Sequence, residues 1–364
     1  MSSMPPSRLK TSSLAILAAA ISVFTGLLHS AHAADAYKWS VQYLVDNSRS
    51  VLGKSQKVSP RHTRSLGISP DGQYLYAGYM HSFSGQGEVR KIDLTVADYE
   101  RATVAVLPGP LAKAIAVDDK GRVYITNENE VLVYDADLEQ RQYRIPAGAC
   151  EGIALHRDGQ DLVLYGSDRD EGTINRWVLK EKDGCICGAT LDGFDNSGAF
   201  KVPGATDLRG LRIDPKGNLW VADLKGNKVF RMGLDGKDLA SFEVRSPIDI
   251  AFDGTRALIT RWQDRGITVI ETGDLSTVGN LNVPWEELEL SVVGNNRNGA
   301  LSGIVVVPGK GFYVANEAGQ TANQKSTYGK VDEHSDFVGG KMYRDSFADD
   351  NDPILHASEV TVQQ

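Results

Sequence analysis

The sequence lacks the short motifs that mark several large classes of enzyme. Its 364 residues include no Gly-x-Ser-x-Gly motif, no glycine-rich phosphate-binding loop and no cysteine–histidine motif for haem attachment. The histidines are scattered, with no pair at the spacing of zinc ligands. These absences argue against a serine hydrolase, a nucleotide-dependent enzyme, a c-type cytochrome and a zinc enzyme.

The sequence also lacks a surplus of positive charge and has a single long hydrophobic run. The formal net charge is −8, which argues against nucleic-acid binding because that function needs a basic surface. The hydrophobic run, residues 14–28, follows Arg8 and Lys10 and precedes Ala31-His32-Ala33. This arrangement is typical of a signal peptide. We predict cleavage after Ala33 and a periplasmic or secreted mature domain without a transmembrane segment; the alternative is an uncleaved N-terminal anchor.

The dominant feature that is present is a strand-rich repeat of about forty residues. Each copy has an apolar run, a turn of Pro, Asp, Lys and Gly type, a second apolar run and a third strand-like segment, most clearly in residues 211–232. Such repeats predict a β-propeller. We expect residues 34–364 to form one all-β domain with six four-stranded antiparallel blades. A seventh blade within residues 274–298 is the alternative, although that stretch lacks the turn of the repeat.

The ends of the chain bear on how the ring closes. Residues 39–45 alternate between apolar and polar side chains, which predicts an outermost strand of the last blade that removes the free sheet edges. In the last copy, the polar residues 319–339 predict a long loop over one face. We expect residues 341–344 to return to the sheet after that loop.

One position of the repeat lies just before the innermost strand, beside the predicted central channel. Alignment of the turn glycines predicts three cations and one carboxylate at this channel mouth. Because arginine suits the recognition of carboxylate and phosphate, the basic residues are candidates to bind an anionic substrate, together with Arg261 and Trp262 at a strand end. Alternatively, each cation pairs with an acidic neighbour across blades. In blade order, the ring position holds Arg64, Lys113, Glu151, Arg209, Ile248 and Ser302.

A second repeated position lies at the end of the second strand, on the same face of the propeller. It holds Asn127, Asp223 and Asn316, which with Glu151 offer oxygen ligands for a divalent cation, Ca²⁺ first. The alternative is that these residues cap their own turns. His81 occupies the same position in the first blade and is a candidate general base, with Glu151 as the second candidate catalytic residue.

The three cysteines leave their oxidation state open. Export favours a disulfide, but the predicted blades place Cys150 at the channel and Cys185 and Cys187 near an outer strand. Such a separation exceeds the distance that a disulfide bridges. Cys150 is then a free thiol, either a nucleophile beside Glu151 or a small buried residue.

Two of the repeat copies carry a resemblance to known proteins. Residues 114–127 and 211–223 resemble NHL repeats and the propellers of the SMP-30/gluconolactonase type, and residues 68–76 look like a YVTN repeat. SMP-30-like enzymes hold a divalent cation with Glu, Asn and Asp and hydrolyse lactones or esters through a metal-bound water. The resemblance implies such a site here. The ring cations depart from the pattern, because they would repel a metal unless they pair with carboxylates.

Two functions of different classes follow from these patterns. In the first, the channel binds a small anionic molecule and carries out metal-dependent lactone or ester hydrolysis. In the second, the propeller is a rigid, non-catalytic platform for a protein, a peptide or a polymer in the cell envelope. Neither function involves nucleic acid.

Overall fold

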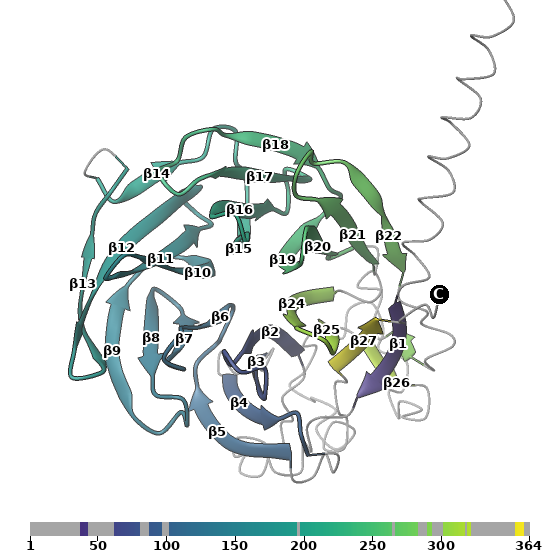
Figure 1. The fold of residues 1–364 in the computed structure, drawn as a ribbon, viewed down its shortest axis with the longest axis horizontal. Helices are drawn as coiled ribbons and strands as arrows, with labels where there is room; N and C mark the ends of the chain where they lie inside the picture. The colour runs from purple at the N-terminus through teal and green to yellow at the C-terminus, as the bar shows by residue number, and fades with distance from the viewer. Residues whose placement is uncertain are drawn as a thin grey trace, which may run out of the picture.

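The strands form a ring of antiparallel sheets around a central axis (Figure 1). Five sheets are built from consecutive strands, and a sixth combines strands from both ends of the chain. The predicted all-β propeller is therefore confirmed. The computed structural model describes residues 37–42, 62–80, 87–96, 102–194, 197–263, 266–282, 290–292, 301–316, 319–321 and 354–359.

The first three blades follow one another along the chain, each with its innermost strand first. Blade 3 carries an additional strand that pairs with the third strand of the blade. The strands are β2 (His62–Ile68), β3 (Tyr74–Met80), β4 (Gly87–Asp93) and β5 (Thr103–Gly109) in blade 1; β6 (Ile115–Val117), β7 (Val123–Asn127), β8 (Glu130–Tyr134) and β9 (Arg141–Pro146) in blade 2; and β10 (Cys150–Asp158), β11 (Asp161–Asp168), β12 (Thr173–Lys182), β13 (Cys185–Leu191) and β14 (Ala199–Lys201) in blade 3.

Blades 4 and 5 repeat the same order of strands from the inside to the outside of the ring. Their strands are β15 (Leu208–Ile213), β16 (Asn218–Asp223), β17 (Lys228–Gly233) and β18 (Ala240–Glu243) in blade 4, and β19 (Pro247–Asp253), β20 (Arg256–Arg261), β21 (Gly266–Glu271) and β22 (Thr277–Asn282) in blade 5.

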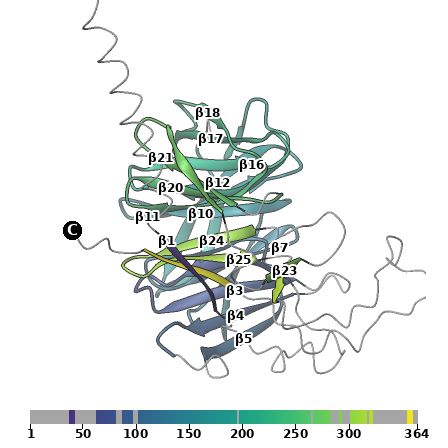
Figure 2. The same ribbon diagram turned by 90° about the vertical axis from the view of Figure 1, so that its right-hand side faces the viewer.

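The sixth blade closes the ring with the N-terminal strand. It consists of β24 (Leu301–Val307), β25 (Gly311–Asn316), β27 (Ile354–Glu359) and β1 (Tyr37–Gln42), in that order. Both views place the purple β1 beside the yellow β27 (Figures 1 and 2). The predicted closure by an N-terminal outermost strand is confirmed. Because β1 pairs with β27, strands from the first and last parts of the chain complete the same four-stranded sheet.

Other predictions about the last blade have different outcomes. The predicted returning strand, residues 341–344, lies outside the described residues, as does most of the predicted loop 319–339. The start of that loop forms β26 (Gly319–Thr321), which pairs with β23 (Leu290–Val292) in a two-stranded sheet. Because β22 belongs to blade 5, the described part of residues 274–298 forms no seventh four-stranded blade.

The hydrophobic core lies between neighbouring blades. On β19, Ala251 packs with residues of blade 6, whereas the adjacent Ile250 packs with residues of blade 4. This alternation follows from the two-residue period of a strand whose two faces are both covered. Trp220 of blade 4 is fully buried, and its ring packs edge-on against Phe252 of blade 5, with 5.5 Å between ring centroids. Trp220 therefore packs between two neighbouring sheets.

No helix among the residues described is long and apolar enough to cross a membrane. The segment predicted as a signal peptide lies outside those residues, so its cleavage remains a prediction.

Candidate functional site

The ring residues lie at irregular positions in the innermost strands. In β2 and β10 the pairing with the next strand shifts at Arg64 and at Glu151, and in β19 it shifts at Ile248. Similar shifts in β15 and β24 span Arg209 and Ser302. A bulge bends the strand and turns the side chain of the extra residue away from the ladder. The bulges therefore aim the ring residues at the channel.

Small residues and hydroxyl groups fix the backbone around these bulges. Gly152, directly after Glu151, approaches the carbonyl oxygen of Arg209 so closely that a Cβ atom would collide with it. The same carbonyl accepts a hydrogen bond of 2.6 Å from the Ser167 hydroxyl. The Ser302 hydroxyl donates to the carbonyl of Arg64. Contacts between neighbouring blades thus hold the ring residues before any ligand arrives.

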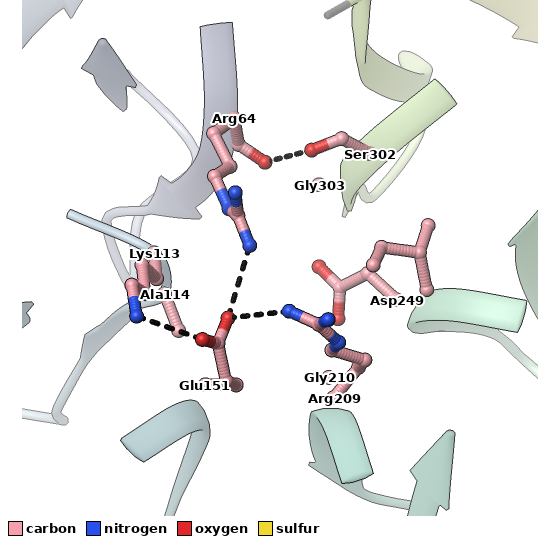
Figure 3. Close-up of a pocket in the computed structure, with 10 residues that line it drawn as sticks. Arg64, Lys113, Ala114, Glu151, Arg209, Gly210, Asp249, Ser302 and Gly303 are labelled. Carbon is pink, nitrogen blue, oxygen red and sulfur yellow. Dashed lines mark hydrogen bonds and ion pairs between the residues drawn. The ribbon is translucent and has the colours of Figure 1, made fainter. Parts of the chain in front are cut away.

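Four cationic side chains converge on the carboxylate of Glu151, and Figure 3 shows Arg64, Lys113 and Arg209 among them. Its Oε2 lies 3.0 Å from Arg64 Nη2 and 3.0 Å from Arg209 Nη1. Its Oε1 lies 2.7 Å from Lys113 Nζ and 3.0 Å from Arg169 Nη1. Only 1% of the Glu151 side chain is exposed, so these pairs lie at the edge of the protein interior, where water screens charge poorly. The predicted convergence of Arg64, Lys113, Glu151 and Arg209 at the channel is therefore confirmed.

The surrounding charges determine the protonation state of Glu151. Burial is the largest single influence and by itself would raise the pKa of the carboxyl. The combined attraction of Arg64, Arg209 and Lys113 outweighs burial and holds the pKa below its usual value. Glu151 therefore stays ionised at neutral pH and is a weak base. Its surroundings suit a residue that fixes cations better than a general base.

Arg169 was not among the predicted site residues. It directly follows β11, at the second-strand end of the blade that carries Glu151, and its side chain is 35% exposed. Its Nε also lies 2.8 Å from Asp170 Oδ1. The strand-end position of its neighbour Asp168 was a signal that could have found it, because such ends return to the channel face.

The cavity beside this cluster is open to solvent, and its empty space, counted with the solvent at its mouth, is about 300 Å³. Its wall includes residues that lie in the innermost strand of a blade or directly before it, and every blade contributes (Figure 3). The lining residues are Arg64, Lys113, Ala114, Glu151, Arg209, Gly210, Ile248, Asp249, Ser302 and Gly303.

Asp249 is a second carboxyl group in the cavity wall that the sequence analysis missed. Its Oδ2 accepts hydrogen bonds from Arg212 Nη2 at 2.7 Å and from the backbone N–H of Ile304 at 3.2 Å. Burial raises the pKa of Asp249, with partial opposition from Arg212. These bonds tie blade 5 to blades 4 and 6. The other blades have serine, alanine or glycine at this position, so a charged residue there was a detectable exception in the sequence.

The described members of the predicted metal set have surroundings that do not fit a cation. The Glu151 carboxylate already pairs with four basic side chains. The carboxylate of Asp223 accepts hydrogen bonds from the backbone N–H groups of Thr206, Asp207 and Gly226, which is turn capping. The Asn127 Oδ1 accepts from the Leu111 N–H at 3.2 Å. Among the residues described, no group of three or more His, Cys, Asp or Glu could hold a metal ion.

Other predicted site residues are not brought to the cavity. His81 lies outside the described residues, and of Asn316 only the backbone, in β25, is described. Arg261 Nη1 lies 3.0 Å from Asn280 Oδ1, on the outermost strand β22, so this guanidinium points away from the channel. Trp262 is half-buried next to it and is not part of the cavity wall.

The three cysteines are free thiols in the structure. Cys150 is buried at the start of the innermost strand β10, whereas Cys185 and Cys187 lie on the outer strand β13. The predicted separation of Cys150, at the channel, from Cys185 and Cys187, on an outer strand, is confirmed. Burial raises the pKa of the Cys150 thiol, and the charge of Glu151 acts in the same direction, so this thiol is a poor nucleophile.

No protein-family model matches the chain, and no curated protein matches it. A solved structure of virginiamycin B lyase from Staphylococcus aureus, a catalytically inactive variant with quinupristin, is 13% identical and covers 89% of this chain and 100% of that chain, with a TM-score of 0.52. A second structure of that lyase is 14% identical, with the same coverage and TM-score. A nidogen–laminin complex is 13% identical over 68% of this chain and 85% of that chain, with a TM-score of 0.48. The two lyase structures support the propeller fold, and the activity has to be argued from the site.

Proposed function

We propose that the channel mouth binds a small anionic molecule through Arg64, Lys113 and Arg209, with Arg169 at the rim. The observation that carries this proposal is that Glu151 pairs with four cationic side chains, three of which, Arg64, Lys113 and Arg209, line a cavity. Among the residues described, Lys113 has Glu151 as its one carboxylate partner. An anion in the cavity would add the negative charge that this cluster attracts.

The geometry also favours binding because the cationic groups are held in place. Glu151 fixes the guanidinium groups of Arg64 and Arg209, and the bulges fix the backbone beneath them. A ligand that binds to preorganised donors loses less free energy to the ordering of side chains. Each charge-assisted hydrogen bond is also stronger than a neutral one.

Metal-dependent lactone or ester hydrolysis has weaker support. A divalent cation at Glu151 would have to enter a cluster that already contains four positive charges, at the Coulomb cost that this implies. The anion-binding proposal therefore expects that treatment with a chelator leaves ligand affinity unchanged. Metal analysis of the purified protein by mass spectrometry tests directly whether a divalent cation is bound, as the hydrolase alternative requires.

A non-catalytic platform for another protein also has weaker support. Large exposed hydrophobic residues among those described are Val104, Leu191 and Leu239, which belong to different blades. Protein-binding surfaces usually gather such residues in one patch. A small-molecule ligand at the channel requires no such patch.

Titration calorimetry with acetate and inorganic phosphate, at constant ionic strength, tests the proposal. The variant Lys113→Gln removes one cation and leaves Glu151 with three arginines. We expect about tenfold weaker binding of the anions, which corresponds to about 1.4 kcal/mol. Arg144→Gln is the matched control, because Arg144 pairs with Glu130 on the exterior, 2.6 Å away, and should bind like the unaltered protein. Absence of binding, or equal affinity in Lys113→Gln, would overturn the proposal.

We also propose that the chain is exported and cleaved after Ala33. The support is the basic, apolar and small-residue pattern of residues 1–33. N-terminal sequencing of the protein from the native envelope should start at Ala34. A protein that retains residues 1–33 in that fraction would instead indicate an uncleaved anchor.

A further inference from the structure

The charges in the cavity wall are distributed unevenly around the channel. Blades 1 to 4 contribute Arg64, Lys113, Glu151 and Arg209 at the ring position, whereas blades 5 and 6 contribute Ile248 and Ser302. Because blades 5 and 6 are neighbours, the two uncharged residues form one continuous arc. Figure 3 shows Arg64, Lys113 and Arg209 directed at Glu151, with Ser302 beside Arg64 and Asp249 beside Arg209.

Blade 5 places apolar side chains at its channel end, next to the carboxyl group of Asp249. Pro247 and Ile248 are buried, and Ile248 contributes to the cavity wall. Trp262 lies beside this segment, since its backbone N–H donates to the Ser246 carbonyl at 2.8 Å. The neighbouring Arg261 is directed to the outer strand. At the ring position, blades 5 and 6 therefore present the apolar side chain of Ile248 and the hydroxyl group of Ser302, with the Asp249 carboxyl group beside them.

The same arc offers no cationic side chain to an anion. All basic residues in the cavity wall come from blades 1, 2 and 4. Asp249 follows Ile248 and is directed to the cavity (Figure 3), where its partner is Arg212. The Ser302 hydroxyl donates to the Arg64 carbonyl. A second negative charge on a ligand would meet an apolar side chain and a carboxyl group here.

We infer that the ligand is a monoanion with an uncharged, largely apolar body. Its carboxylate, or an equivalent group, binds at Arg64, Lys113 and Arg209, and its body lies against Ile248 and Ser302. This inference rests on the proposed function, because it names the class of anion that the same site takes. Di- and polyanions of similar size are excluded by the arc formed by blades 5 and 6.

Butanoate and succinate provide a matched test, since they share a four-carbon skeleton and differ in the second carboxylate. Calorimetry at pH 7.5 and constant ionic strength should give at least about tenfold tighter binding of butanoate than of succinate. Butanoate should also bind about tenfold tighter than acetate, because each buried methylene group adds to the free energy of binding.

Two variants of Ile248 test whether the preference for butanoate arises at blade 5. Ile248→Lys places a cation on the uncharged arc and should reverse the preference, so that succinate binds more tightly than butanoate. Ile248→Gln should remove the advantage of butanoate over acetate without a gain for succinate. Circular dichroism and melting temperature establish that each variant is folded, and if neither folds, the comparison of ligands on the unaltered protein still decides.

The outcomes separate this inference from the proposed function. If no anion binds to the unaltered protein, both fail. If succinate or inorganic phosphate binds as tightly as butanoate, the inference is overturned and the proposed function stands. A folded Ile248→Lys variant that still prefers butanoate would overturn the placement of the ligand body at blade 5.

Discussion

Blade 3 carries a glutamate surrounded by cations at each of its two ends. Glu151 is the second residue of the innermost strand β10, at the channel end, and Glu181 lies near the end of β12, at the opposite end of the blade. The carboxylate of Glu181 lies 2.8 Å from Lys120 Nζ, 2.6 Å from Arg122 Nη2 and 3.0 Å from Arg157 Nη1. By composition alone the two clusters look alike.

The clusters differ in how their charges are matched. At the Glu181 end, Arg122 also pairs with Asp118 at 2.5 Å, and Arg157 also pairs with Asp119 at 2.8 Å. That network contains three cations and three carboxylates, and it links blades 2 and 3. At the channel end, Lys113 shares the Glu151 carboxylate with three arginines, and Arg64, Lys113 and Arg209 line a cavity. Two of the arginines have a further carboxylate: Arg209 pairs with Asp207 and Arg169 with Asp170, each at 2.8 Å. These four cations at the channel end meet three carboxylates, so positive charge is in excess beside a cavity, which suits an anionic ligand. The network around Glu181 has equal numbers of both charges and stabilises the fold.

Of the substitutions at the two ends of blade 3, Glu151→Gln is expected to lower the free energy of unfolding most. The substitution removes the charge that holds four cations together in a largely buried place, and loss of one partner of a buried pair typically costs about 3 kcal/mol or more in the free energy of unfolding. Urea denaturation at pH 7 measures this cost. Glu130→Gln, which breaks the exterior pair with Arg144, should cost less than about 1 kcal/mol. Equal costs for the two variants would show that the channel cluster is no more strongly coupled than a surface pair.

The sequence was sufficient to predict the propeller and the main members of the channel cluster. The repeat has a turn at a constant place, so Arg64, Lys113, Glu151 and Arg209 could be aligned without coordinates. The pairing among them could not be predicted, because it depends on bulges and on the contact of Gly152 with the neighbouring blade, both of which are three-dimensional features.

The metal set shows where alignment of positions misleads. Asn127 and Asp223 do lie at equivalent strand ends, but their side chains bind backbone N–H groups of their own blades. Residues of these types cap turns as readily as they bind cations. Sequence position alone does not distinguish the two roles, since the orientation of the side chain decides between them.

A smaller effect is expected from Glu181→Gln, with a defined dependence on pH. Arg157 is the largest cause that lowers the pKa of Glu181, from its ordinary value of 4.5 to about 2. A carboxyl with a lowered pKa in the folded state stabilises the fold above its unfolded pKa and loses this contribution as the pH falls through the folded value. We expect the free energy of unfolding of the variant to be about 1 kcal/mol lower than that of the unaltered protein at pH 7. This difference in free energy should shrink as the pH falls from about 4.5 towards 2.

Urea denaturation of both proteins at a series of pH values from 7 to 3 measures this dependence. Glu243→Gln, on the outer strand β18 of blade 4, is a control that should show no comparable trend. A difference that grows as the pH falls would contradict the assigned direction of the pKa shift. The same result would mean that the ionised Glu181 carboxylate does not stabilise the fold, which is the role assigned here to the balanced network.

The smallest perturbation compares the two ends of blade 3 through their thiols. Cys150 adjoins Glu151, is 1% exposed, and its thiol has a raised pKa. At the other end of the blade, Cys185 lies opposite Lys182 in the pairing of β12 with β13, near Glu181, and Cys187 is exposed. An aromatic disulfide reagent should therefore modify two thiols in the folded, reduced protein, Cys187 first, and the third only after unfolding. Cys150→Ala should leave the fast phase unchanged. Rapid modification of Cys150 would mean that the channel end opens readily, which is incompatible with a preorganised anion site beside Glu151.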